Sequence, residues 1–153
     1  MFDFVKLERV LGVHFRNPGL CREAFTHKSF AAEHDLKYDN QRLELLGDSV
    51  VQIVLTEELF KRYPALQEGA LTKIRSAIVN QGSLAAFARE LSLGEFLMLG
   101  KGEIELGGAD RDSTISDLFE AYTGALYLDQ GLEAARSFLM PLVNRQYPEP
   151  SDV

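Results

Sequence analysis

A long helical pattern that contains acidic residues constrains this chain more than any other feature. Apolar residues recur from Gln41 to Tyr63 at the spacing of an α-helix and cover most of its circumference, which is typical of a central helix. The pattern begins with the segment Asn40–Asp48, which also carries two carboxylates. Glu44 and Asp48 are four positions apart, so they lie on one face, one turn from each other.

Gly47 stands beside these two acids. A glycine inside a helix costs about 1 kcal/mol relative to alanine, so its presence indicates that something approaches the backbone closely there. The acids also have an ordinary interpretation. They belong to a polar stripe that could be the solvent-facing side of an amphipathic helix: Gln41, Glu44, Asp48 and Gln52. Taken alone, the segment favours this ordinary interpretation.

A second acidic pair lies in a helix predicted over residues 113–128. Asp117 and Glu120 are three positions apart and share a face, and Gly124 follows one turn later on the same side. If the two acidic faces met, the glycines would let the backbones approach and four carboxylates would converge. They would repel one another unless a hard divalent ion, such as Mg²⁺ or Mn²⁺, neutralised them. Alternatively, these acids only stabilise a helix N-terminus, by about 0.3–1 kcal/mol.

The rest of the chain predicts shorter helices around these two. We expect them over residues 5–11, 17–25, 68–80, 83–91 and 132–143, with a polar connection beginning at residue 26 and an irregular loop over 97–112. No stretch alternates in the way that a half-buried strand requires. The predicted fold is therefore all-α, with a central buried helix wrapped by the others.

Length and composition predict one compact domain. The 153 residues are 46% apolar, with 10 Phe, so residues 1–146 can bury a sizeable core, and 147–153 read as a C-terminal tail or the start of a linker. Without a secretory leader or a long apolar run, we expect a soluble cytoplasmic protein that does not enter a membrane. The net charge of −7 excludes a uniformly basic nucleic-acid-binding surface but allows a local basic patch.

Several segments resemble the ribonuclease III family. Residues 40–49 are similar to the family signature N-E-R-L-E-F-L-G-D-S. Further similar segments follow the family order: Phe25–Ser29, Glu68–Thr72, Leu99–Glu103 and Ser116–Ala121. The resemblance covers about residues 5–145, and because several motifs occur in order it is more specific than either acidic pair.

This resemblance implies an all-helical endonuclease domain that forms a homodimer and cleaves double-stranded RNA in RNA processing. The family uses Mg²⁺, for which Mn²⁺ is a possible substitute, and leaves 5′-phosphate and 3′-hydroxyl ends with short 3′ overhangs. Its metal-binding carboxylates fall on Glu44, Asp48, Asp117 and Glu120. By this similarity Asp48 and Glu120 are the most critical for catalysis, and Glu68 has a supporting role.

The chain departs from the family pattern at two positions. The first glutamate of the signature is Gln41 here, and since the family associates this position with the scissile strand, we expect a changed cleavage rate or site choice. In the family, a phenylalanine of this signature inserts into the partner subunit, and Leu45 takes its place here. This smaller side chain predicts either a weaker dimer or a partner pocket whose shape compensates for it.

The chain also stops where many relatives continue into a double-stranded-RNA-binding domain. We therefore expect low, salt-sensitive RNA affinity that rests on local cations. Candidates for such contacts are Lys73, Arg75, Arg89, Lys101 and Arg111.

Two other functions stay open at this point. A catalytically weak or silent relative could act as an RNA-binding scaffold, which the loss of charge at Gln41 favours and the four retained carboxylates disfavour. A metal-free helical interaction domain would require both acidic pairs to be accidental surface charge.

Overall fold

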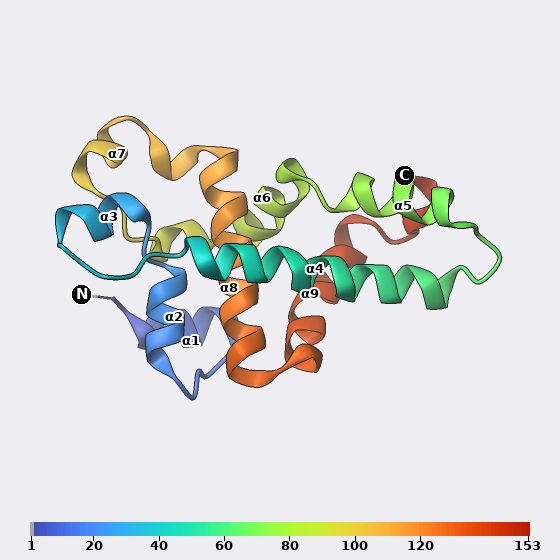
Figure 1. Ribbon diagram of the computed structural model, residues 1–153, viewed down its shortest axis with the longest axis horizontal. Helices are drawn as coiled ribbons and strands as arrows, with labels where there is room; N and C mark the ends of the chain where they lie inside the picture. Colours follow the sequence, from blue (N-terminus) through green and yellow to red (C-terminus); the bar gives the residue numbers. More distant parts are fainter. Residues whose placement is uncertain (1) are drawn as a thin grey trace.

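The computed structural model describes residues 2–153, and these residues form helices and no strand. The α-helices are α1 (Phe4–Leu11), α2 (Pro18–Ala24), α3 (Lys28–Glu33), α4 (Gln41–Arg62), α5 (Glu68–Ile78), α6 (Gln81–Glu90), α7 (Lys101–Glu105), α8 (Asp112–Gln130) and α9 (Leu132–Gln146) (Figure 1). Short 3₁₀ turns occur at Leu93–Phe96, Gly108–Asp110 and Pro150–Asp152. The predicted all-α fold is confirmed. Within this described part, every helix is too short or too polar to cross a membrane.

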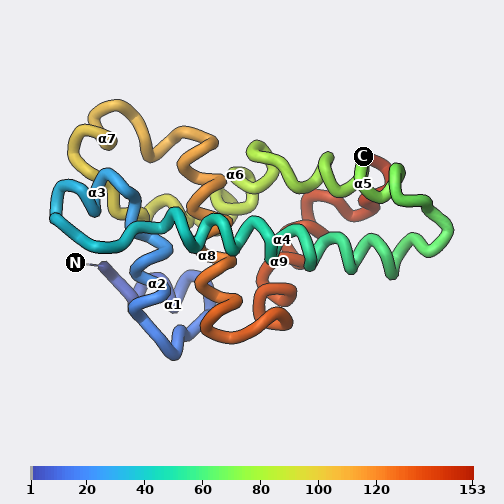
Figure 2. Tube along the Cα trace, viewed as in Figure 1, coloured from blue at the N-terminus to red at the C-terminus, as the bar shows by residue number. Residues whose placement is uncertain are grey.

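Two long helices, α4 and α8, cross at the centre of the molecule (Figures 1 and 2). Helix α8 is the most enclosed element, because its residues between Thr114 and Leu126 are buried on nearly every side. Helix α4 packs one face against α8 but keeps a stripe of apolar residues in solvent. This stripe consists of Leu45, Ile53 and Phe60. The predicted central helix is therefore present, with one side uncovered.

Gly47 of α4 and Gly124 of α8 lie at this crossing. A Cβ atom added to Gly47 would overlap the backbone carbonyl of Glu120 and lie 3.0 Å from the Gly124 nitrogen. A Cβ atom added to Gly124 would overlap the carbonyl oxygen of Leu43. The two helices therefore touch backbone to backbone, as the glycines in the sequence predict.

The N-terminal helices follow their sequence signals closely. Helix α1 ends at Gly12, which has φ +68°, the left-handed conformation that glycine adopts without strain. Asn17 caps α2 by accepting a hydrogen bond from the Gly19 N–H at 3.0 Å. Asp129, near the end of α8, accepts 2.8 Å hydrogen bonds from the N–H groups of Arg16 and Asn17, which fixes α2 against α8.

Two short helices, α3 and α7, lie where we predicted a polar connection and an irregular loop, so these two predictions are wrong. Each helix is held by the other. The Gly100 N–H donates to Ser29 Oγ at 2.8 Å, and the Lys101 N–H donates to Glu33 Oε2 at 2.6 Å. Segments of five or six residues are too short to show an apolar period, and contacts with each other stabilise them instead.

The segment after α9 folds back against the end of α4. Pro150 is buried. The Ser151 N–H donates a hydrogen bond to the Tyr63 hydroxyl at 3.1 Å, and that hydroxyl in turn donates a hydrogen bond to the Glu149 carboxylate. The C-terminus accordingly lies beside α5 (Figure 2). Residues 147–153, which we predicted as a tail or the start of a linker, thus lie in contact with the helical body.

Candidate metal centre

Four carboxylates converge where α4 crosses α8. Glu44, Asp117 and Glu120 each offer an oxygen atom that lies within 4.8 Å of the others. Asp48, one turn after Glu44 on α4, lies close enough to Glu120 to raise the pKa of that carboxyl. Of the four residues that the sequence singled out as a possible metal-binding set, the structure thus groups Glu44, Asp117 and Glu120 directly and places Asp48 near Glu120.

The acids perturb one another because they are close and partly removed from solvent. Burial raises the pKa of Glu120 to about 8, with further contributions from the hydrogen bond and the charge of Asp48. Burial also raises the pKa of Glu44 to about 7, and the neighbouring Asp117 adds to this rise. The pKa of Asp117 is likewise raised by burial. At neutral pH the cluster therefore favours bound protons or a bound cation.

The donor set fits a hard divalent cation. All the converging side chains offer carboxylate oxygens, which are the ligands that Mg²⁺ and Mn²⁺ prefer. A bound cation would stabilise the charged carboxylates against the burial and the mutual repulsion that raise their pKa values. The backbone contact at Gly47 and Gly124 holds the two acidic faces together without any intervening side chain. The cluster is therefore a suitable binding site for a cation.

The raised pKa values predict a pH dependence of stability in the absence of divalent ions. Between pH 5.5 and 8.5 the unfolded chain has already lost these protons, because an unperturbed glutamate has a pKa of 4.5, whereas the folded protein loses them only as the pH passes about 7 for Glu44 and about 8 for Glu120. The free energy of unfolding should therefore fall as pH rises through this window. Urea titrations in chelator at several pH values measure it.

A Glu120→Gln variant provides the control, because its amide cannot titrate. The other titrating groups are common to both proteins, so the difference between the two stability curves reports Glu120 and its coupling to the neighbouring acids. We expect the wild-type protein to lose stability relative to the variant as pH rises. Parallel curves for the two proteins from pH 5.5 to 8.5 would contradict the prediction.

A cavity of about 660 Å³ opens beside the acidic cluster, between α3, α4, α7 and α8. Glu44 and Asp117 form part of its lining, and Gln41, the first residue of α4, lies on the same wall. His27 and Lys28, at the start of α3, line another part. Lys28 lies in the family-like segment Phe25–Ser29, but no periodic pattern in the sequence predicted that this segment lines the same cavity as the acidic cluster.

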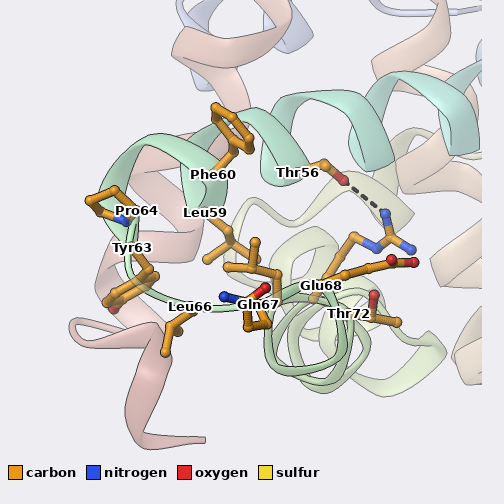
Figure 3. Close-up of a pocket in the computed structure, with 11 residues that line it drawn as sticks. Thr56, Leu59, Phe60, Tyr63, Pro64, Leu66, Gln67, Glu68 and Thr72 are labelled. Carbon is orange, nitrogen blue, oxygen red and sulfur yellow. Dashed lines mark hydrogen bonds between the residues drawn. The ribbon is translucent and has the colours of Figure 1, made fainter.

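Glu68 does not join the acidic cluster within this chain. It begins α5, past the C-terminal end of α4, and lines a separate cavity of about 500 Å³ together with Phe60 and Tyr63 (Figure 3). Since the 22 residues of α4 extend for about 33 Å, most of that length separates Glu68 from Glu44. A supporting role for Glu68 stays a prediction.

Two of the five cations suggested as RNA contacts are paired within the described structure. Arg89 lies 2.7 Å from Asp112, and Arg111 lies 2.6 Å from Glu103. Lys73, an exposed residue of α5, makes no such ion pair among residues 2–153. Arg89 and Arg111 would have to exchange a carboxylate for a phosphate in order to bind RNA.

Comparison with known proteins gives consistent matches over most of the chain. Residues 17–146 match the family model described as Ribonuclease-III-like. Ribonuclease 3 from Bacillus licheniformis is 49% identical over 143 residues, which cover 92% of this chain and 57% of that protein. Ribonuclease 3 from Methylococcus capsulatus is 49% identical over 139 residues, which cover 91% of this chain and 58% of that protein. The chain thus spans somewhat more than half the length of the curated relatives it matches.

Solved structures share the fold. The nuclease domain of ribonuclease III from Campylobacter jejuni has a TM-score of 0.88 and 38% identity, and the match covers 95% of this chain and 99% of that one. That structure is described as showing structural flexibility in a region involved in dimer formation. Dicer from Pichia stipitis has a TM-score of 0.61 and 25% identity, with 92% of this chain and 58% of that chain covered.

Proposed function

Because this chain belongs to the ribonuclease III family, we propose that it is an endonuclease that cleaves double-stranded RNA with the help of Mg²⁺. The convergence of Glu44, Asp48, Asp117 and Glu120 at one helix crossing supports this most directly. A scaffold protein would have no need to hold mutually repelling carboxylates together. The products would carry 5′-phosphate and 3′-hydroxyl ends with short 3′ overhangs, as the family resemblance implies.

The four carboxylates would hold the metal, and Mn²⁺ would be an acceptable substitute for Mg²⁺. When bound, the metal would supply Lewis-acid stabilisation of the phosphodiester and of the attacking water. Asp48 lies near Glu120 across the crossing, so the two carboxylates could share one ion. Gln41 lines the same cavity and can donate or accept a hydrogen bond at the substrate.

The test is incubation of a long RNA duplex with the protein, in Mg²⁺ or in excess chelator, beside single-stranded RNA and a DNA duplex of the same sequence. Shortening of the RNA duplex alone, and only with Mg²⁺, would support the proposal. Binding of the duplex without cleavage would instead support the scaffold alternative. Cleavage that continues in chelator would rule out the metal-dependent mechanism.

We also propose that two copies of this chain form the active unit through the uncovered side of α4. Leu45, Ile53 and Phe60 are 74%, 51% and 70% exposed, although all three are large apolar residues. They recur at helical spacing along one side of α4. If two α4 helices packed antiparallel about a two-fold axis near Ile53, Leu45 of each would face the Phe60 end of the other. The dimer region named for the Campylobacter jejuni domain supports such an assembly.

This arrangement would also give Glu68 a role. Phe60 and Glu68 line the same cavity (Figure 3), and Leu45 is the direct neighbour of Glu44. If Leu45 of one copy entered that cavity of the other, Glu68 would come close to the acidic cluster across the interface. The supporting role of Glu68 would then operate between subunits rather than within one chain.

A Leu45→Asp variant is expected to shift the protein from dimer to monomer, because it places a charge in the proposed apolar contact. Val5→Asp is a matched control, since Val5 is 68% exposed on α1, away from this stripe. Sedimentation equilibrium or light scattering measures the mass of each variant. A Leu45→Asp protein with the same mass as the wild type would contradict the proposed interface.

A Gln41→Glu variant is expected to cleave faster or at altered positions, because it restores a carboxylate to the cavity beside Glu44. Gln81→Glu makes the same chemical change at the exposed first residue of α6 and should have no effect. Single-turnover rates and mapping of product ends measure both effects. Unchanged kinetics and unchanged ends in Gln41→Glu would show that this position does not limit the reaction.

A further inference from the structure

One wall of the cavity beside the acidic cluster carries hydrogen-bond donors. His27 and Lys28 are adjacent in sequence at the start of α3, and both line the cavity that Glu44 and Asp117 also line. Lys28 also lies close enough to Asp117 that its positive charge counteracts the rise in the pKa of that carboxyl, which is raised mainly by burial. The cavity thus has a positively charged side chain, Lys28, on one wall and the carboxylates Glu44 and Asp117 on another.

The hydrogen bonds of His27 determine which of its ring nitrogens carries the proton. Its Nδ1 accepts a hydrogen bond from the Ser29 N–H at 3.1 Å and lies 2.7 Å from Ser29 Oγ. Ser29 Oγ in turn accepts from the Gly100 N–H at 2.8 Å, which leaves the hydroxyl hydrogen free to donate to Nδ1. Nδ1 is therefore unprotonated, and Nε2 carries the hydrogen of the neutral ring.

Nε2 has no hydrogen-bond partner among residues 2–153, although the half-buried ring lines the cavity. Lys28 is exposed, and within the same residues its ammonium group makes no ion pair with a carboxylate. Arg111, also on the lining, is already paired with Glu103 at 2.6 Å. Lys28 is thus the cation of this wall that remains available to an incoming anion.

We propose that the Nε2–H group of His27 and the ammonium group of Lys28 form a phosphate-binding subsite for the RNA strand that is cleaved. The subsite holds a backbone phosphate next to the one at the acidic cluster, and it thereby sets the position of the strand. This inference rests on the proposed function, since it needs RNA in the cavity. His27 and Lys28 act here as positioning residues, because the phosphate that they contact is not the one that reacts.

Helix α3 is suited to this task because its position is fixed. The Ser29–Gly100 and Glu33–Lys101 hydrogen bonds join α3 to the start of α7, so the helix that carries the two donors is tied to a second segment of the chain. A phosphate contact of this kind adds affinity without reading sequence. Its loss should weaken binding equally for duplexes of different sequence.

The test measures the affinity for a 20-base-pair RNA duplex by fluorescence anisotropy at several salt concentrations, in a Glu120→Gln background so that the RNA stays intact. Lys28→Ala should weaken binding about tenfold, and the negative slope of the logarithm of the association constant against the logarithm of the salt concentration should become shallower by about one. Lys28→Arg, which keeps the charge, should bind with the affinity and the slope of the parent protein. His27→Asn keeps a capping acceptor for α3 but lacks the Nε2–H group. It should weaken binding severalfold with an unchanged slope, since no charge is lost.

Arg9→Ala is the charge-matched control, because Arg9 lies on α1 and lines a different depression of the surface. It should leave affinity and slope unchanged. With Glu120 intact, Lys28→Ala should raise KM and leave kcat nearly constant. If the parent protein binds the duplex and Lys28→Ala binds it with the same affinity and slope, the subsite does not exist. If the parent binds no duplex at all, the proposed function itself fails, and the subsite with it.

Discussion

Glutamine in place of Glu120 is expected to lower the rate of RNA duplex cleavage by roughly 10³-fold or more. The change removes one negative charge from the centre of the acidic cluster while keeping the size of the side chain. Metal-assisted charge stabilisation contributes several kcal/mol to such reactions, and each 1.36 kcal/mol is a tenfold change in rate. Single-turnover cleavage of a labelled duplex at saturating protein measures the effect directly.

The loss of activity should occur without loss of the fold. Because the pKa of Glu120 is raised by burial and by Asp48, the neutral amide relieves repulsion, so the variant should be at least as stable as the wild type above pH 7. Glu95→Gln, at an exposed position outside the cluster, controls for the chemical change. A Glu120→Gln protein that retains activity within tenfold of the wild type would contradict the proposed site.

Alanine in place of Gly47 is expected to destabilise the protein by roughly 3 kcal/mol or to prevent folding. Intrinsic helix propensity predicts the opposite, a gain of about 1 kcal/mol. The new methyl group, however, would overlap the backbone carbonyl of Glu120, which cannot rotate away as a side chain can. Overpacking in a core costs about 1–3 kcal/mol even where side chains can adjust, so this rigid contact should reach the upper end or exceed it.

Gly69→Ala is the matched control for this variant. Gly69 also lies in a helix, but a Cβ atom there would meet nothing within 4 Å, so the substitution should be neutral or slightly stabilising. Urea titration of both variants gives the two free energies of unfolding. If Gly47→Ala were as stable as Gly69→Ala, the backbone contact between α4 and α8 would not be tight.

The main helices and the acidic set could be predicted because they leave periodic signals in the sequence. The four-residue spacing of Glu44 and Asp48, and the three-residue spacing of Asp117 and Glu120, each define one helix face. Gly47 then indicated where the helices approach. These local signals predicted which acids share a helix face, but the spacing alone also allowed an ordinary solvent-facing stripe, and the similarity to the ribonuclease III signature was needed to assign the four acids to a metal site.

The other parts of the cavity could not be predicted, because they depend on contacts between distant segments. Helix α3 is held by hydrogen bonds to residues about 70 positions further along the chain. Contacts between such distant segments leave no periodic pattern in the sequence. Glu68 illustrates the reverse case, since motif similarity gave it a supporting role while the fold of a single chain places it past the other end of α4.

The glycine crossing has a consequence for how this site tolerates evolutionary change. The separation of the acid-bearing helices is set by main-chain atoms in contact, not by the volume of any side chain between them. Substitutions that enlarge or shrink apolar residues elsewhere in the interior would therefore leave the ligand geometry nearly constant. Sequences can drift widely around such a crossing and still inherit the same spacing of oxygen donors.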